Sequence, residues 1–126
     1  MDELQLLYTE QILERWKNPR NYGEIDDKTV EAEDSNPLCG DRIKIALKVQ
    51  GKKIVDAKFT GTGCSISQAS ADLMTEFVIG KDASILRKLN KDDVLRILGI
   101  ELTAVRLKCA LLSLKVLKLA SLNLSQ

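Results

Sequence analysis

The sequence predicts an α+β domain in which a small antiparallel sheet of about three strands is covered by helices. The periodicity of the apolar residues carries this prediction, because it changes once along the chain. Between residues 43 and 60 apolar and polar residues alternate, whereas after residue 64 apolar residues recur every three or four positions. We therefore expect strands in the first half and helices in the second half of a single domain over residues 1–126.

The clearest strands form a hairpin that turns at Gln50-Gly51. The alternating apolar positions are Ile43, Ile45, Leu47 and Val49 in the first strand and Val55, Ala57 and Phe59 in the second. Alternation of this kind is typical of a strand with one buried face. A shorter edge strand is predicted over residues 29–33.

The remaining apolar patterns predict helices. The predicted ranges are 4–17, 65–80, 83–89, 92–98 and 105–119. Pro19 ends the first of these helices and Gly99 ends the fourth. The last helix carries Val105, Cys109 and Leu112 on one apolar stripe.

Composition excludes some classes of function. The 126 residues are 44% hydrophobic and 29% charged, as in soluble globular proteins. The net charge of +1, the absence of a basic block and the 4% aromatic content argue against a nucleic-acid surface. The acidic start does not resemble a signal peptide, and Lys115 and Lys118 interrupt the last apolar run, so neither export nor a membrane span is predicted.

The chain has three cysteines and no histidine, so thiols must carry any soft-metal or sulfur chemistry. An odd number of cysteines without an export signal fits the cytoplasm, where thiols are free or bound to metal. Cys39 lies in a loop before the first clear strand, and Cys64 lies where a glycine-rich turn becomes a helix. A helix start favours the thiolate. Cys109 lies on an apolar stripe, where a plain core cysteine is the simpler interpretation.

Asp41 follows Cys39 by two residues and is either a solvated turn residue or an oxygen ligand. Three thiolates and one carboxylate could complete a tetrahedral zinc site or hold a [2Fe–2S] cluster. Lys108 and Arg106 are either solvated charges or cations that favour the thiolate of Cys109, and Arg106 could instead pair with Asp41. Spacing alone leaves these alternatives open.

Four segments together resemble the iron–sulfur assembly family that includes the IscU scaffold, the NifU N-terminal domain and SufU. The opening helix and its Asn-Pro turn (7–23) are similar to the start of that family. The other three segments each surround a cysteine: Asn-Pro-Leu-Cys-Gly-Asp-Arg-Ile (36–43), Asp-Ala-Lys-Phe-Thr-Gly-Thr-Gly-Cys-Ser-Ile-Ser-Gln-Ala-Ser (56–70) and Arg-Leu-Lys-Cys-Ala (106–110).

The resemblance implies that Cys39, Asp41, Cys64 and Cys109 converge at one exposed end of the domain. It further implies a scaffold, not an enzyme, that accepts sulfur from a cysteine desulfurase on Cys39 or Cys109. Such a scaffold builds a transient [2Fe–2S] cluster and passes it to apo recipient proteins or carriers. The alternative is a zinc-bound sulfur acceptor that relays sulfur for the desulfurase. A cluster shared between two subunits of a homo-oligomer is a further arrangement that an exposed thiol rim allows.

Two departures separate this chain from individual branches of the family. Lys108 stands where the IscU branch has a histidine, and residues 102–106 replace the Leu-Pro-Pro-Val-Lys segment that a dedicated Hsp70 chaperone recognises. Recognition by that chaperone is therefore not predicted. The motifs are similar to SufU, yet the chain lacks the longer segment that SufU-type proteins have between the second and third cysteines.

Overall fold

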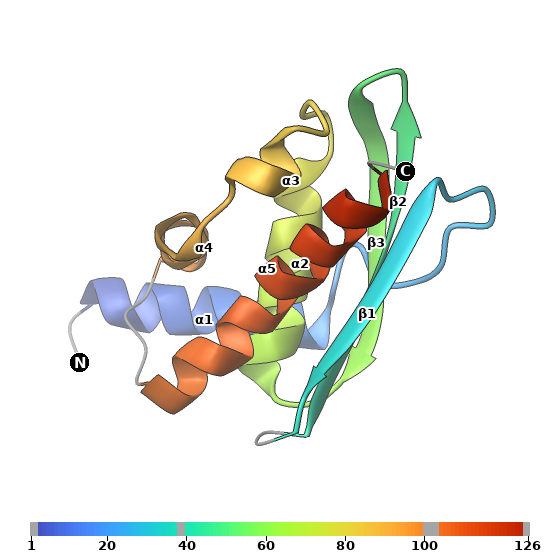
Figure 1. The fold of residues 1–126 in the computed structure, drawn as a ribbon. Coiled ribbons are helices and arrows are strands. Elements are labelled where there is room, and N and C mark those ends of the chain that lie inside the picture. The colour runs from blue at the N-terminus through green and yellow to red at the C-terminus, as the bar shows by residue number, and fades with distance from the viewer. Residues whose placement is uncertain (1–2, 38–39, 100–103, 125–126) are drawn as a thin grey trace.

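The structure, a computed structural model, describes residues 3–37, 40–99 and 104–124. Three antiparallel strands form one sheet in the order β1-β2-β3, and helices pack against one of its faces (Figure 1). The strands are β1 (Val30–Asn36), β2 (Asp41–Gln50) and β3 (Lys53–Thr62). The predicted α+β class is confirmed, and β1 is an edge strand, longer than the predicted one.

The helices are α1 (Glu3–Lys17), α2 (Ser65–Val78), α3 (Ile85–Lys88), α4 (Lys91–Leu98) and α5 (Ala104–Leu124). All five occur near their predicted ranges. α2 lies at the centre, where it contacts α1, α4, α5 and the sheet, and α5 crosses β1 and β2. None of the described helices is both long and apolar enough to cross a membrane.

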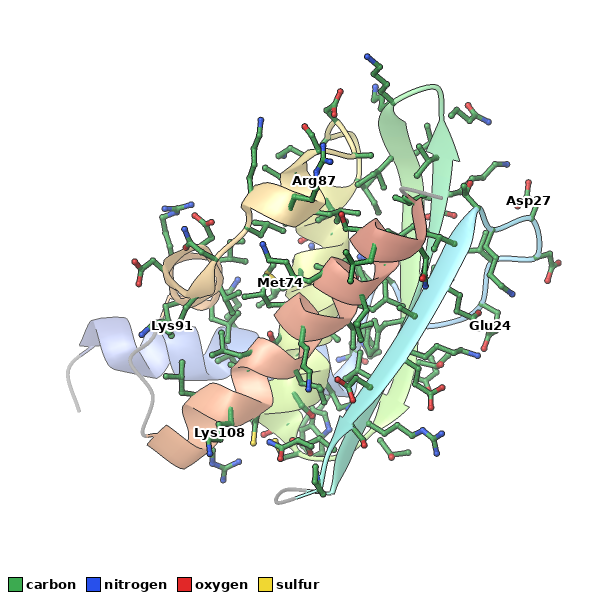
Figure 2. The ribbon with its side chains drawn as sticks, viewed as in Figure 1. Glu24, Asp27, Met74, Arg87, Lys91 and Lys108 are labelled. Carbon is green, nitrogen blue, oxygen red and sulfur yellow. The ribbon has the colours of Figure 1, made fainter. Side chains whose placement is uncertain are left out.

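The core lies between the inner face of the sheet and the two long helices α2 and α5. Ile43, Ile45 and Leu47 of β2 are completely buried, and Phe59 of β3 is 1% exposed. Met74 of α2 packs into the same cluster, and Figure 2 shows it behind α5. Alternation along β2 therefore sets which face of the sheet the helices cover.

One detail of the predicted hairpin is wrong. The register between β2 and β3 shifts at Lys48/Val49, so that Val49 is paired with Ile54 and no longer with Val55. Ile54 is consequently buried, while Val55 is only half-buried. A bulge inserts one residue and moves the following side chains to the opposite face, which strict alternation cannot anticipate.

The connector between α1 and β1 crosses the outer face of the sheet. It begins beside β3, where the backbone N–H of Gly23 donates to Phe59 O and the N–H of Phe59 donates to Asn21 O. It then contributes Glu24, which pairs with Lys44 at 2.8 Å, and Asp27, which pairs with Lys48. Figure 2 shows Glu24 and Asp27 on the side away from the helices.

A buried carboxylate on α2 holds the start of this connector. Asp72 is completely buried, and its Oδ1 accepts the backbone N–H groups of Arg20 at 2.9 Å and Asn21 at 2.8 Å. Its Oδ2 pairs with Arg15 of α1 at 2.9 Å. Burial opposes the charged form of Glu76, but the hydrogen bond and charge of Arg15 outweigh burial and hold the pKa of Glu76 below its usual value.

We expect Asp72→Ala to lower the free energy of unfolding by about 3–5 kcal/mol, because it removes the acceptor of two backbone N–H groups and one of the two carboxylate partners of the buried Arg15 guanidinium, which keeps only Glu76. Asp72→Asn keeps one acceptor oxygen and should therefore lower the free energy of unfolding by a smaller amount. Urea unfolding at constant m-value measures both changes. The exposed Asp26→Ala variant serves as a control with a change of about 0.5 kcal/mol or less. A wild-type midpoint for Asp72→Ala would contradict this role of the carboxylate.

Candidate metal centre

Three elements bring a carboxylate and two thiols together at one end of the domain. Asp41 is the first residue of β2, Cys64 precedes the first turn of α2, and Cys109 lies near the start of α5. One ligand atom from each residue lies within 4.8 Å of the others. In Figure 1 the start of β2, the turn from β3 into α2 and the start of α5 all lie at the lower end of the molecule.

Asp41 is buried, with 1% of its surface exposed, so its interpretation as a solvated turn residue is wrong. The two carboxylate oxygens have different neighbours. Oδ1 accepts the backbone N–H of Cys64 at 2.8 Å, whereas Oδ2 lies 3.7 Å from the sulfur of Cys64. One oxygen therefore fixes the turn that carries Cys64, and the other faces the thiol where a metal ion would bind.

Cys64 forms the N-cap of α2, as the sequence predicts. Its sulfur accepts the backbone N–H of Ser67 at 3.5 Å, and its carbonyl accepts the Ser67 hydroxyl at 3.1 Å. The sulfur therefore lies against the first turn of α2. The residue is half-buried, which leaves the thiol within reach of solvent.

Gly63 makes the contact between Cys64 and Asp41 sterically possible. Its φ of +136° lies in a region that side chains rarely adopt, and a Cβ there would meet Asp41 Oδ1 at 2.1 Å. At Gly63 the place that a side chain would take is occupied by the carboxylate that faces the thiol.

Cys109 is 2% exposed and packs where the apolar stripe of α5 meets α2. The prediction that Cys109 is buried like a core cysteine is therefore confirmed. Its sulfur nevertheless belongs to the donor group with Asp41 and Cys64. A thiol at the edge of the core can serve both roles, since burial excludes water from one side of a bound metal.

The other predicted site residues differ in their placement. Cys39 lies outside the described residues. Lys108 and Arg106 are exposed on α5, and Lys108 lines a groove of about 520 Å³ together with Pro37 and Leu111. Figure 2 shows Lys108 near the start of α5, at the same end of the molecule as the donor group.

The donor set fits a thiophilic metal. Zinc binds thiolates at about 2.3 Å and carboxylate oxygens at about 2.0–2.2 Å, which places tetrahedral donors about 3.3–3.8 Å apart. Donor atoms within 4.8 Å of one another need only a small inward movement to reach that separation. Three donors leave one position of a tetrahedron for a further ligand.

The fold and the donor group define a small α+β domain with two thiols and a carboxylate grouped at one end, as in a candidate metal site. The model of the NifU-like N terminal domain matches residues 7–125, and the chain belongs to this family.

The relatives include both a sulfurtransferase and a scaffold protein. The zinc-dependent sulfurtransferase SufU of Bacillus subtilis is 38% identical, and the match covers 91% of this chain and 89% of the relative. The iron–sulfur cluster assembly scaffold protein IscU of Thermotoga maritima is 36% identical over 97% of both chains.

Solved structures confirm the architecture. A candidate iron–sulfur cluster assembly scaffold protein for the SUF system from Fervidobacterium islandicum superposes with a TM-score of 0.75 at 29% identity, covering 93% of this chain and 98% of that one. A NifU-like N-terminal domain from Brucella abortus reaches the same TM-score at 20% identity, which shows the shared fold alone.

We expect Gly63→Ala to weaken zinc binding and to destabilise the fold, because the new methyl group displaces the Asp41 carboxylate. Gly51→Ala is the matched control: its φ is +64°, but nothing lies within 4 Å of the added Cβ. In the control, backbone strain should lower the free energy of unfolding by about 1–2 kcal/mol, and the zinc affinity should stay unchanged. Competition with a chromophoric chelator, beside urea unfolding, separates the two effects. Equal zinc affinity in both variants would rule out the proposed role of Gly63.

Proposed function

We propose that the chain is an iron–sulfur cluster assembly scaffold, which accepts sulfur from a cysteine desulfurase and assembles and transfers a [2Fe–2S] cluster. Cys39, Asp41, Cys64 and Cys109 are the proposed ligands. The observation that carries this proposal is the grouping of one carboxylate and two thiols, from three separate elements, within 4.8 Å. The similarity to the scaffold protein IscU of Thermotoga maritima, which extends over 97% of this chain, supports it.

Sulfur arrives by thiol exchange. A thiolate of the scaffold attacks the outer sulfur of the desulfurase persulfide, a new S–S bond forms, and the desulfurase cysteine leaves as a thiolate. The attacking thiol must reach the partner, and Cys109 is 2% exposed. This burial favours Cys39 over Cys109 as the first acceptor. The chain thus takes part covalently while the desulfurase performs the catalysis.

The cluster is cargo, and the ligands must hold it and then release it to apo recipient proteins or carriers. Cys64 and Cys109 would supply soft thiolates, which bind the irons of a cluster firmly. Asp41 Oδ2 supplies a hard oxygen, which binds iron more loosely than a thiolate does. The mixed donor set favours a cluster that can be transferred.

A second candidate function is a zinc-bound sulfur acceptor that relays sulfur from the desulfurase. Two observations favour it: the similarity to a zinc-dependent sulfurtransferase, and a donor set that also suits zinc. In this version zinc holds the resting thiols, and docking of the desulfurase frees Cys39 to accept sulfur.

Metal and sulfide analysis of protein purified without oxygen decides between the two functions. We expect reconstitution with ferrous iron, cysteine, a cysteine desulfurase and an excess of a thiol reductant, which reduces the persulfide sulfur to sulfide, to yield iron and sulfide in equal amounts, about two of each per cluster. A Cys64→Ser variant should lose this capacity, since it removes a central thiolate. One tightly bound zinc and no reconstitutable cluster would instead establish the relay.

The two oxygens of Asp41 can be tested separately. Asp41→Asn keeps an oxygen to accept the Cys64 N–H but removes the negative ligand, so we expect a cluster that survives longer against a chelator. Asp41→Ala also removes the acceptor and should in addition lower stability by about 1–3 kcal/mol. Asp56→Asn on β3 is the control, because that carboxylate also accepts a backbone N–H, at 2.9 Å, outside the donor group.

Decay of the visible absorbance of the cluster under chelator gives the lifetimes. Unchanged or faster decay in Asp41→Asn than in the wild-type protein would count against Asp41 as the labile ligand.

A further inference from the structure

A pair of buried serines joins the two helices that carry Cys64 and Cys109. Ser70 lies on α2 and Ser113 on α5, and both are completely buried. The Ser70 hydroxyl lies 2.7 Å from the carbonyl of Ala110, and the two hydroxyl oxygens are 2.9 Å apart. Ser113 also lies 3.3 Å from the same carbonyl.

These distances define a consistent set of hydrogen bonds. When Ser70 donates to Ala110 O over the shortest distance, the proton between the hydroxyls must come from Ser113. Each buried hydroxyl then uses its one proton, and neither is left unsatisfied. A fully satisfied polar network in a low-dielectric interior favours one arrangement of the helices over neighbouring ones, which apolar packing alone specifies less sharply.

The hydrogen-bond network of the two serines lies near both thiols along the chain. Ala110 directly follows Cys109, so its carbonyl belongs to the same turn of α5. Ser70 lies six residues after Cys64, which is about 9 Å along a helix at about 1.5 Å per residue. Cys64 itself is bonded to Ser67 of α2 and to Asp41. The serine pair therefore extends this chain of contacts from the Cys64 turn to α5.

We propose that Ser70 and Ser113 are positioning residues: Ser70 donates to the Ala110 carbonyl and Ser113 donates to Ser70, and these two bonds hold α5 against α2 and thereby set the separation of Cys64 and Cys109 for metal binding. The inference rests on the proposed function of the thiol group as a metal centre. It assigns the serines no contact with the metal itself.

The test compares Ser70→Ala with Thr75→Val in zinc affinity. Thr75 is also a completely buried hydroxyl residue of α2, but its hydroxyl bonds only to carbonyls of its own helix among the described contacts, those of Ala71 and Asp72. Both variants lose a buried hydroxyl and should melt at lower temperature. Residues that orient metal ligands typically change affinity by about 10–100-fold, and we expect about a tenfold loss for Ser70→Ala. Thr75→Val should bind zinc as the wild-type chain does.

A second measurement reports geometry independently of stability. Cobalt(II) replaces zinc in thiolate sites, and the positions and intensities of its visible bands depend on the arrangement of the ligands. We expect these bands to shift in Ser70→Ala and in Ser113→Ala but not in Thr75→Val. The double serine variant should lose little more affinity than Ser70→Ala alone, because the two hydroxyls act as one unit.

The outcomes separate this inference from the proposed function. Wild-type affinity and wild-type cobalt bands in Ser70→Ala, beside normal binding by the wild-type chain, overturn the positioning role alone. Equal losses in Ser70→Ala and Thr75→Val also overturn it, since they would reflect general stability. A wild-type chain that binds neither zinc nor cobalt overturns the metal-site proposal and this inference with it.

Discussion

The hydrogen bond from the Cys64 backbone N–H to Asp41 Oδ1 is the contact on which the metal centre depends. It joins Asp41, the first residue of β2, to Cys64, the N-cap residue of α2, and so fixes the start of the strand against the start of the helix. The same contact turns Oδ2 towards the thiol. Gly63 is the sequence requirement of this arrangement, since any side chain there would occupy the place of the carboxylate.

A buried carboxylate recurs at a second place in the fold, with a different balance of charge. Asp72 accepts two backbone N–H groups and is neutralised by Arg15, so its cost of burial is offset within the protein. Asp41 is buried beside two thiols, which add negative charge when they ionise. A bound cation relieves that repulsion, so metal binding and deprotonation of the thiols are coupled. Asp72 therefore stabilises the fold, whereas Asp41 is suited to a metal.

The sequence anticipates the fold well wherever periodicity carries the information. Alternation along residues 43–49 identifies β2 and its buried face, and the grouping of Asp41, Cys64 and Cys109 follows from the resemblance to known motifs. Alternation predicts Val55 on the buried face, yet Val55 is only half-buried and Ile54 is buried, because a bulge leaves no trace in the alternation. The roles of Asp72, Ser70 and Ser113 were missed, since a polar residue within a helix does not reveal a partner some forty or more positions away. Serines beside the apolar stripes of two helices are the one signal that could have suggested the interhelical contact.

The three residues of the candidate site lie on three different elements, so their spacing depends on how those elements pack. A site built within a single loop would keep its geometry whatever the rest of the fold did. Here Cys109 is carried by α5, whereas Asp41 and Cys64 are fixed to each other by a direct hydrogen bond. The separation of Cys109 from the other two residues therefore depends on the packing of α5 against α2, to which the Ser70–Ser113 contact contributes.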